Sequence, residues 1–237
     1  MTVSTKKFIL YPNAQWYFAL AIITTWVGFS MSYFARLEQV TIYHHIHGAT
    51  AGLWLALMVV QPILYNRGKL KLHRKLGWIG SLTLMPLMVL GGLKMMQLGI
   101  INQASYPPGV IYRLSFIDAY SLIQFILFYV LSIYNAKHIH AHARYMACTV
   151  LTILPPAITR LLFFIPWFNN FNKTLNGSFT IVELILFILI WDDKRSGKFR
   201  APYFVAMAIF ALLHLTMNLV SGWPWWKDAM DWYARGK

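Results

Sequence analysis

Residues 43–77 read YHHIHGATAGLWLALMVVQPILYNRGKLKLHRKLG, and this stretch decides the fold. An apolar run over residues 49–64 is followed by a short basic turn and by a second apolar run that begins near Leu72. Apolar runs of this length predict membrane-spanning helices, so the segment predicts a helical hairpin through a bilayer. Histidines flank the first run at both ends: His44, His45, His47 and His73.

The composition of the whole chain indicates an all-α integral membrane protein. The 237 residues are 58% hydrophobic and 12% charged, whereas a soluble domain is about one quarter charged. Helices pair their own backbone polar groups inside lipid, and the alternating pattern of a membrane barrel is absent. The net charge of +14 does not indicate nucleic-acid binding, because Lys and Arg lie mostly in short turns between the apolar runs.

The apolar runs recur along the chain without a linker or a convincing repeat, which predicts a single integral-membrane domain over residues 1–237. We expect a polytopic bundle of seven transmembrane helices at about 15–34, 41–64, 72–93, 116–134, 145–168, 179–191 and 202–220. The Pro155–Pro156 pair should kink the fifth of these helices.

The distribution of basic residues predicts the orientation. With the N-terminus in the cytoplasm, Lys6, Lys7 and the basic turns after the second, fourth and sixth spans all lie inside, and these carry most of the Lys and Arg. An odd number of spans then places the C-terminus outside. The expected location is the inner membrane of a bacterium, in contact with the lipid bilayer.

The predicted topology sorts the ionisable groups into two layers. A helical path from His47 to His73 would span roughly 39 Å, so these residues lie near opposite faces of a core about 30 Å thick. Ionisable groups at membrane depth are costly, and each is a functional hypothesis. The outer layer supplies Arg160 and the candidate metal ligands, which are His44, His45, His47, Asp118, Glu183 and His214.

The inner layer holds His73, followed much later in the chain by His138, His140 and His142. His138 and His142 are four residues apart and would share one face of a helix. Neutral imidazole is a versatile metal ligand, so such groups can hold a metal or one axial position of a haem. The simpler interpretation is a solvated cytoplasmic loop here, and histidines that cap a helix start in the outer layer.

These residues resemble the motifs of a family of uncharacterised bacterial predicted membrane proteins. The likeness covers residues 44–165 and has three elements: a His-xxx-Gly start of a span at His47, a Leu-His-Arg-x-x-Gly element at residues 72–77, and a His-x-Arg-x-Met element at residues 142–146 that precedes a span containing Arg160. The family implies no settled activity. A weaker resemblance, to transmembrane b-type cytochromes and ferric reductases, rests on Gln61–Pro62 and residues 73–77 and implies haem ligation by histidine.

We therefore expect a membrane protein with a b-type haem or a transition metal (Fe, Zn or Cu), acting in electron transfer with a quinone or a redox partner protein. Bis-imidazole ligation needs two histidines from different helices at one depth. In the outer layer this pairs His47 with His214. In the inner layer it pairs His73 with His140 or His142, as ligands or as quinone contacts. Arg160 would pair with a haem propionate or with Glu183.

Two other functions fit the same residues. A non-haem metal enzyme would use histidines with Asp118 or Glu183, although the His-x-x-His-His boxes of membrane desaturases are missing. A proton-linked transporter or an assembly factor would use the two layers as a proton relay, although no inverted repeat is visible. Whether the protein is an enzyme is left open by the sequence.

Overall fold

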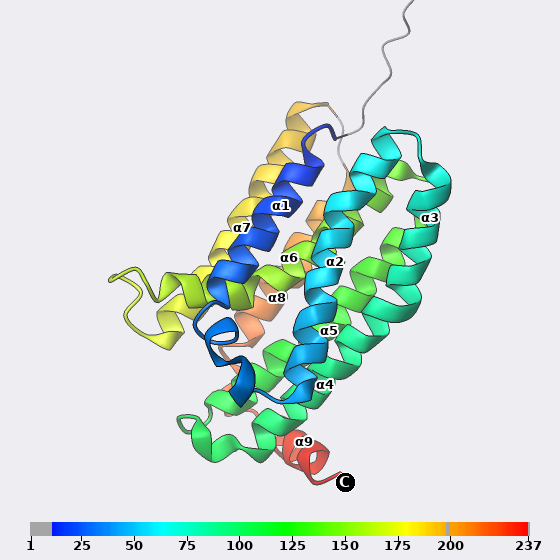
Figure 1. The fold of residues 1–237 in the computed structure, drawn as a ribbon. Coiled ribbons are helices and arrows are strands. Elements are labelled where there is room, and N and C mark those ends of the chain that lie inside the picture. Colours follow the sequence, from blue (N-terminus) through cyan, green and yellow to red (C-terminus); the bar gives the residue numbers. More distant parts are fainter. Residues whose placement is uncertain (1–10, 198–199, 237) are drawn as a thin grey trace, which may run out of the picture.

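The computed structural model describes residues 11–197 and 200–236, and within these ranges every regular element is a helix (Figure 1). The α-helices are α1 (Ala14–Gly28), α2 (Ile42–Asn66), α3 (Leu70–Ile79), α4 (Met85–Ile101), α5 (Val110–Tyr134), α6 (Ile139–Leu162), α7 (Phe171–Arg195), α8 (Ala201–Thr216) and α9 (Pro224–Arg235). Short 3-10 turns lie at Phe34–Gln39, Gln103–Ser105 and Val220–Gly222. The predicted all-α class is confirmed.

Five of the described segments are long and apolar enough to cross a membrane: Ile42–Asn66, Leu70–Ile101, Val110–Tyr134, Ile139–Leu162 and Phe171–Arg195. The second of these joins α3 to α4 through a π-helical turn at Gly80–Leu84. The first and last predicted spans correspond to α1 and α8, which have 15 and 16 residues. Both fall short of the about 20 residues that span a bilayer core. The structure thus supports a multi-pass membrane bundle with five spans.

The hairpin predicted from residues 43–77 forms as expected, and glycine makes its turn possible. Gly68 has φ of 73°, in the left-handed region that favours glycine. The amide of Lys69 donates to the carbonyl of Leu64 at 2.9 Å, and the amide of Gly68 donates to the carbonyl of Tyr65 at 2.9 Å. These two bonds form a Schellman motif, which satisfies the last carbonyls of α2 and reverses the chain into α3.

Helix α6 is the centre of the bundle, with α1, α5, α7 and α8 packed around it. Of its apolar window 67% is buried, against 33% or less for the other four spans. Helix α1 approaches α6 closely, because a Cβ built on Gly28 would lie 2.5 Å from the carbonyl oxygen of Ala157. Helix α6 therefore carries the residues that can contact most of the other helices, and it continues through Pro155 and Pro156.

Three helices begin earlier than the sequence predicted. Helix α5 starts at Val110 instead of 116, α6 at Ile139 instead of 145, and α7 at Phe171 instead of 179. The added turns are polar and lie at helix ends, where side chains such as Asn170 cap backbone amides. Hydrophobicity alone reports only the apolar part of a spanning helix. The histidine-rich segment before residue 145, predicted to be a polar connection, is consequently the first turn of α6.

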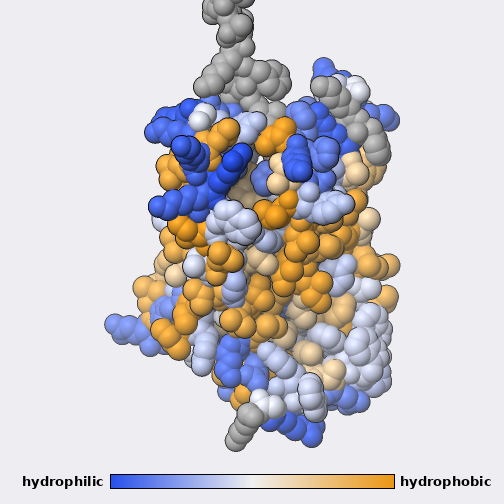
Figure 2. Space-filling view, turned by 90° about the vertical axis from the view of Figure 1, so that its right-hand side faces the viewer, coloured by the Kyte–Doolittle hydropathy of each residue, from blue (hydrophilic) through white to orange (hydrophobic). Residues whose placement is uncertain are grey.

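The Trp-rich tail forms α9, an additional helix that packs across α4 and α5 at the end of the bundle opposite the start of α1 (Figure 1). Buried Gln97 donates to the carbonyls of Tyr233 and Gly236, both at 3.1 Å, and Trp226 donates to the carbonyl of Tyr112 at 2.9 Å. On the face that Figure 2 shows, apolar residues cover the middle of the bundle between more hydrophilic ends, as expected of a membrane protein. Lys6 and Lys7, used in the predicted orientation, lie outside the described residues.

Candidate functional site

Two histidines from different helices are in ring contact at the end of the bundle where the α2–α3 turn lies. His73 is in the first turn of α3 and His142 is in the first turn of α6. Their ring centres are 6.4 Å apart and their planes are inclined by 70°. Tyr65, near the end of α2, packs edge-on against His73 with ring centres 6.0 Å apart. The structure thus brings together two of the predicted inner ligands.

Each of these two rings is held on a backbone carbonyl by its Nδ1 atom. Nδ1 of His73 lies 3.4 Å from the carbonyl oxygen of Gln61, and Nδ1 of His142 lies 3.0 Å from that of Ser132. Because a carbonyl only accepts, these contacts place the hydrogen on each Nδ1 and leave the lone pair on each Nε2. The hydroxyl of Ser132 also lies 2.9 Å from Nδ1 of His142; since it donates to the carbonyl of His142, it accepts from the ring. Neither Nε2 has a hydrogen-bond partner among the residues that the structure describes. This is the tautomer of a metal-ligating histidine.

Side chains on the neighbouring helices fix the backbone that carries the two rings. Gln61 is 7% exposed and donates through Nε2 to the carbonyl of His73 at 3.1 Å, while its own Oε1 has no described partner. Buried Ser132 donates to the carbonyl of His142 at 3.1 Å. Residues on α2 and α5 therefore set the positions of the rings on α3 and α6 before any ligand is bound.

A second polar network lies at the same end of the bundle and joins α6 to α7. Arg144 forms a buried, bidentate ion pair with Asp193 and also donates to the hydroxyl of Tyr11. Nδ1 of His140 lies 3.0 Å from this hydroxyl and 3.0 Å from Nη1 of Arg200. His140 thus belongs to the Arg144 network, whereas His142 belongs to the His73 pair. His138 is exposed at the N-cap of α6.

In the outer layer His47 is held between α2 and α4. Its Nδ1 lies 2.8 Å from the carbonyl oxygen of Met88. The absence of side chains on Gly91 and Gly92 allows this contact, since a Cβ on either would lie 3.1–3.3 Å from His47 atoms. His44 and His45 are bonded locally, to Thr41 at 2.8 Å and to Tyr33 at 2.9 Å. These two contacts fit the simpler interpretation of histidines at a helix start.

His214 is engaged between α7 and α8. Its Nδ1 lies 2.9 Å from Oε1 of Glu183, and its Nε2 lies 3.1 Å from Oδ1 of Asn176. No hydrogen bond or ring contact joins His214 to His47 among the described residues. The predicted outer pair is therefore not assembled by direct contact in this structure, and its role as a haem site stays a prediction.

Arg160 makes contacts with α6 and with the segment after α1. Its Nε donates to the hydroxyl of Ser32 at 2.9 Å, its Nη1 donates to the carbonyl of Pro156 at 2.7 Å, and its guanidinium lies 4.3 Å from the ring centre of Phe29. It interacts electrostatically with exposed Asp118 on α5, without a hydrogen bond. Glu183, expected as the partner of Arg160 in place of a haem propionate, is bonded to His214 instead.

No three His, Cys, Asp or Glu side chains within the described ranges come close enough to hold one metal ion. Among the candidate ligands, His73 contacts His142 and His214 is bonded to Glu183, whereas His44, His45 and His47 are bonded to other residues. The sequence analysis did not predict the ion pair of Arg144 with Asp193. One feature of the sequence could have pointed to a buried carboxylate here. Asp192 and Asp193 are the only acidic residues between Glu183 and Asp228, and they adjoin a basic turn.

Comparisons of this chain with known protein families, with curated proteins and with solved structures find no match. The site must therefore be interpreted from its own geometry.

Proposed function

We propose that this chain is a seven-span protein of the bacterial inner membrane that binds a b-type haem through His73 and His142 and transfers electrons at the inner face. The observation that carries the proposal is the pair of facing imidazoles, each with its Nδ1 on a carbonyl and its Nε2 lone pair available. In the proposed topology α1 and α8 complete the seven spans, and the N-terminus is cytoplasmic.

The spacing of the two rings fits two ligands of one iron atom. A metal held at about 2.0–2.1 Å from each of two opposed imidazole nitrogens would place the ring centres about 6 Å apart. The observed separation is 6.4 Å.

The number of donors favours haem over a free metal ion. Structural and catalytic zinc sites use three or four protein ligands, and no such cluster occurs within the described ranges. A haem needs only two axial ligands from the protein, because the porphyrin supplies the other four. The non-haem enzyme interpretation would need a further donor from water or substrate. Arg74 adjoins His73 on α3 and would neutralise a propionate.

The haem would supply a one-electron couple, and the residues of this chain would hold and tune it. Gln61 and Ser132 fix the Nδ1–H groups of the two ligands, which keeps both Nε2 atoms unprotonated. The position at the inner end of the spans leaves the pair accessible from the cytoplasmic side. A redox protein there, or a quinone within the bilayer, would exchange the electron.

The test is the absorption spectrum and the metal content of the full chain, purified from haem-replete cells. We expect a Soret band and about one iron per chain in the wild type. His73→Ala and His142→Ala should each lose most of the pigment, whereas His138→Ala should keep it, because His138 lies outside the pair. Size-exclusion profiles check that all variants fold. Wild-type protein without pigment or stoichiometric metal would refute the proposal, and so would pigment retained in both ligand variants.

A further inference from the structure

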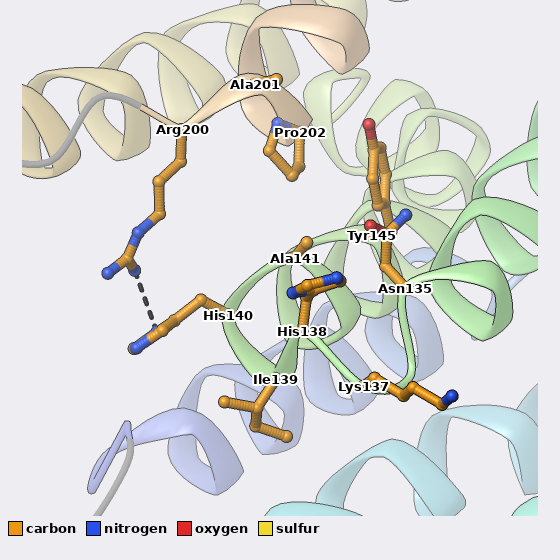
Figure 3. Close-up of a pocket in the computed structure, with 10 residues that line it drawn as sticks. All are labelled: Asn135, Lys137, His138, Ile139, His140, Ala141, Tyr145, Arg200, Ala201 and Pro202. Carbon is orange, nitrogen blue, oxygen red and sulfur yellow. Dashed lines mark hydrogen bonds between the residues drawn. The ribbon is translucent and has the colours of Figure 1, made fainter.

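An open recess lies between the starts of α6 and α8, at the same end of the bundle as the histidine pair but lined by different residues (Figure 3). Its volume is about 530 Å³, which is large enough for a small polar group. Figure 3 shows Arg200 reaching from the segment before α8 toward His140 on α6, to which it is hydrogen-bonded. The proposed haem ligands are absent from this lining.

The lining is rich in positive charge and in hydrogen-bond donors. Its polar members are Asn135, Lys137, His138, His140, Tyr145 and Arg200, and none of the described lining residues is acidic. The nearest carboxylate in the network, that of Asp193, is already paired with Arg144. The recess therefore keeps the charge of Lys137 and Arg200 without a neutralising acid in its wall.

The electrostatic surroundings of Arg200 agree with an excess of positive charge. Partial burial lowers the pKa of Arg200, and the neighbouring Arg144 cation lowers it further, while Asp193 and Tyr203 act in the opposite direction. A negatively charged ligand would relieve this imbalance. The guanidinium is held in place by the hydroxyl of Tyr11 at 3.2 Å and by His140 at 3.0 Å, so it is oriented in advance.

Two helices also present their N-terminal ends to the recess. Residues 138–141 of α6 and residues 200–202 of α8 line it, and neither N-cap side chain, of His138 or of Arg200, bonds to a backbone amide of its helix. The N-terminal end of a helix carries a partial positive charge and unpaired N–H groups. Two such ends at one recess add to the attraction that the side chains exert on an anion.

We propose that this recess binds a phosphate group at Arg200, with Lys137 adding positive charge from another part of the lining. A phosphate offers several strong acceptor oxygens and a negative charge, which match the guanidinium, the ammonium and the helix ends. The recess lies at the inner end of the spans, the depth at which phospholipid headgroups lie, and basic pockets between helices at this face are suited to anionic headgroups. A soluble phosphate compound from the cytoplasm carries the same chemistry.

The test compares ligand binding to the full chain in detergent by native mass spectrometry. The probes are phosphatidylglycerol, glycerol phosphate and inorganic phosphate. The variants are Arg200→Gln and Lys137→Gln, with Arg67→Gln as the control, since Arg67 is an exposed basic residue of the α2–α3 turn outside the recess. Lys137 is exposed and has no described side-chain bond, so its substitution should leave folding intact even if that of Arg200 does not.

We expect Arg200→Gln to weaken phosphate binding at least about tenfold, which corresponds to the loss of one charge-assisted hydrogen bond. Lys137→Gln should weaken it by a smaller factor, through the loss of a nearby charge, and Arg67→Gln should match the wild type. If the recess variants bind phosphatidylglycerol more weakly than the wild type but leave the other two probes unaffected, the site takes a lipid headgroup. If they bind glycerol phosphate or inorganic phosphate more weakly, the site takes a soluble ligand. Binding of all three probes that is equally tight in wild type, Lys137→Gln and Arg67→Gln would overturn the proposal. None of these outcomes bears on the haem ligands.

Discussion

The buried ion pair of Arg144 with Asp193 allows a quantitative prediction about the stability of the bundle. The two side chains are 5% and 7% exposed, so solvent does not screen their interaction. Arg144 also bonds to the hydroxyl of Tyr11 and to the carbonyl of His140. Exposed ion pairs contribute about 0–1 kcal/mol, whereas removing one partner of a buried pair costs about 3–5 kcal/mol. The burial places this pair in the second class.

We therefore expect Asp193→Asn to lower the free energy of unfolding by about 3 kcal/mol or more, because it leaves the guanidinium of Arg144 buried without a counter-charge. Arg144→Met should cost a similar amount for the opposite reason. The double variant Arg144→Met/Asp193→Leu should recover much of the loss, since no unpaired charge remains. The neighbouring Asp192 is exposed, so Asp192→Asn should change the stability by less than about 0.5 kcal/mol.

The assay is reversible unfolding of the purified chain in mixed micelles of a mild detergent and dodecyl sulfate, followed by circular dichroism. The reasoning is refuted if Asp193→Asn is as stable as Asp192→Asn, because the pair would then behave as a surface contact. It is also refuted if the double variant is less stable than both single variants, because the cost would then come from lost packing and not from an unpaired charge.

Two further predictions concern packing. Gly28→Leu should destabilise the bundle by about 1–3 kcal/mol, because the added side chain separates α1 from α6. Gly52→Ala should be nearly neutral, because no atom lies within 4 Å of its added Cβ. Equal unfolding midpoints for the two variants would contradict this reasoning. Gln97→Leu should loosen α9, since it removes two bonds to the helix end, and limited proteolysis should then cleave after residue 222 faster than in the wild type. An unchanged cleavage rate would show that the remaining contacts of α9, which include the bonds to Tyr112, are enough to hold it.

The sequence predicted the general architecture well because hydrophobicity and turn chemistry are local signals. The basic turn at Gly68 and the apolar runs on either side of it specify the hairpin without knowledge of other helices. The polar first turns of α5, α6 and α7 were missed, because hydropathy measures contact with lipid and these turns lie at helix ends. Helix α9 was missed because its stability comes from bonds to Gln97 and Tyr112, far away in the chain.

The candidate site was predicted in part. The two layers of histidines followed from span order, but a layer does not determine which rings meet. His140 and His142 are two residues apart on α6 and therefore point in different directions, so one joins Arg200 and the other joins His73. Only the packing of α3 and α8 against α6 decides between them. The buried Asp193 was likewise indistinguishable from exposed Asp192 until α7 was placed against α6.

The most direct test of the account is the electron paramagnetic resonance spectrum of the oxidised, purified protein, measured for wild type, His73→Ala and His142→Ala. The account predicts a six-coordinate, low-spin ferric haem in the wild type and its loss in both variants, with a high-spin signal from any iron that remains. A wild-type spectrum without a low-spin haem signal, or one that persists unchanged in either variant, would contradict the central claim that these two imidazoles ligate the iron.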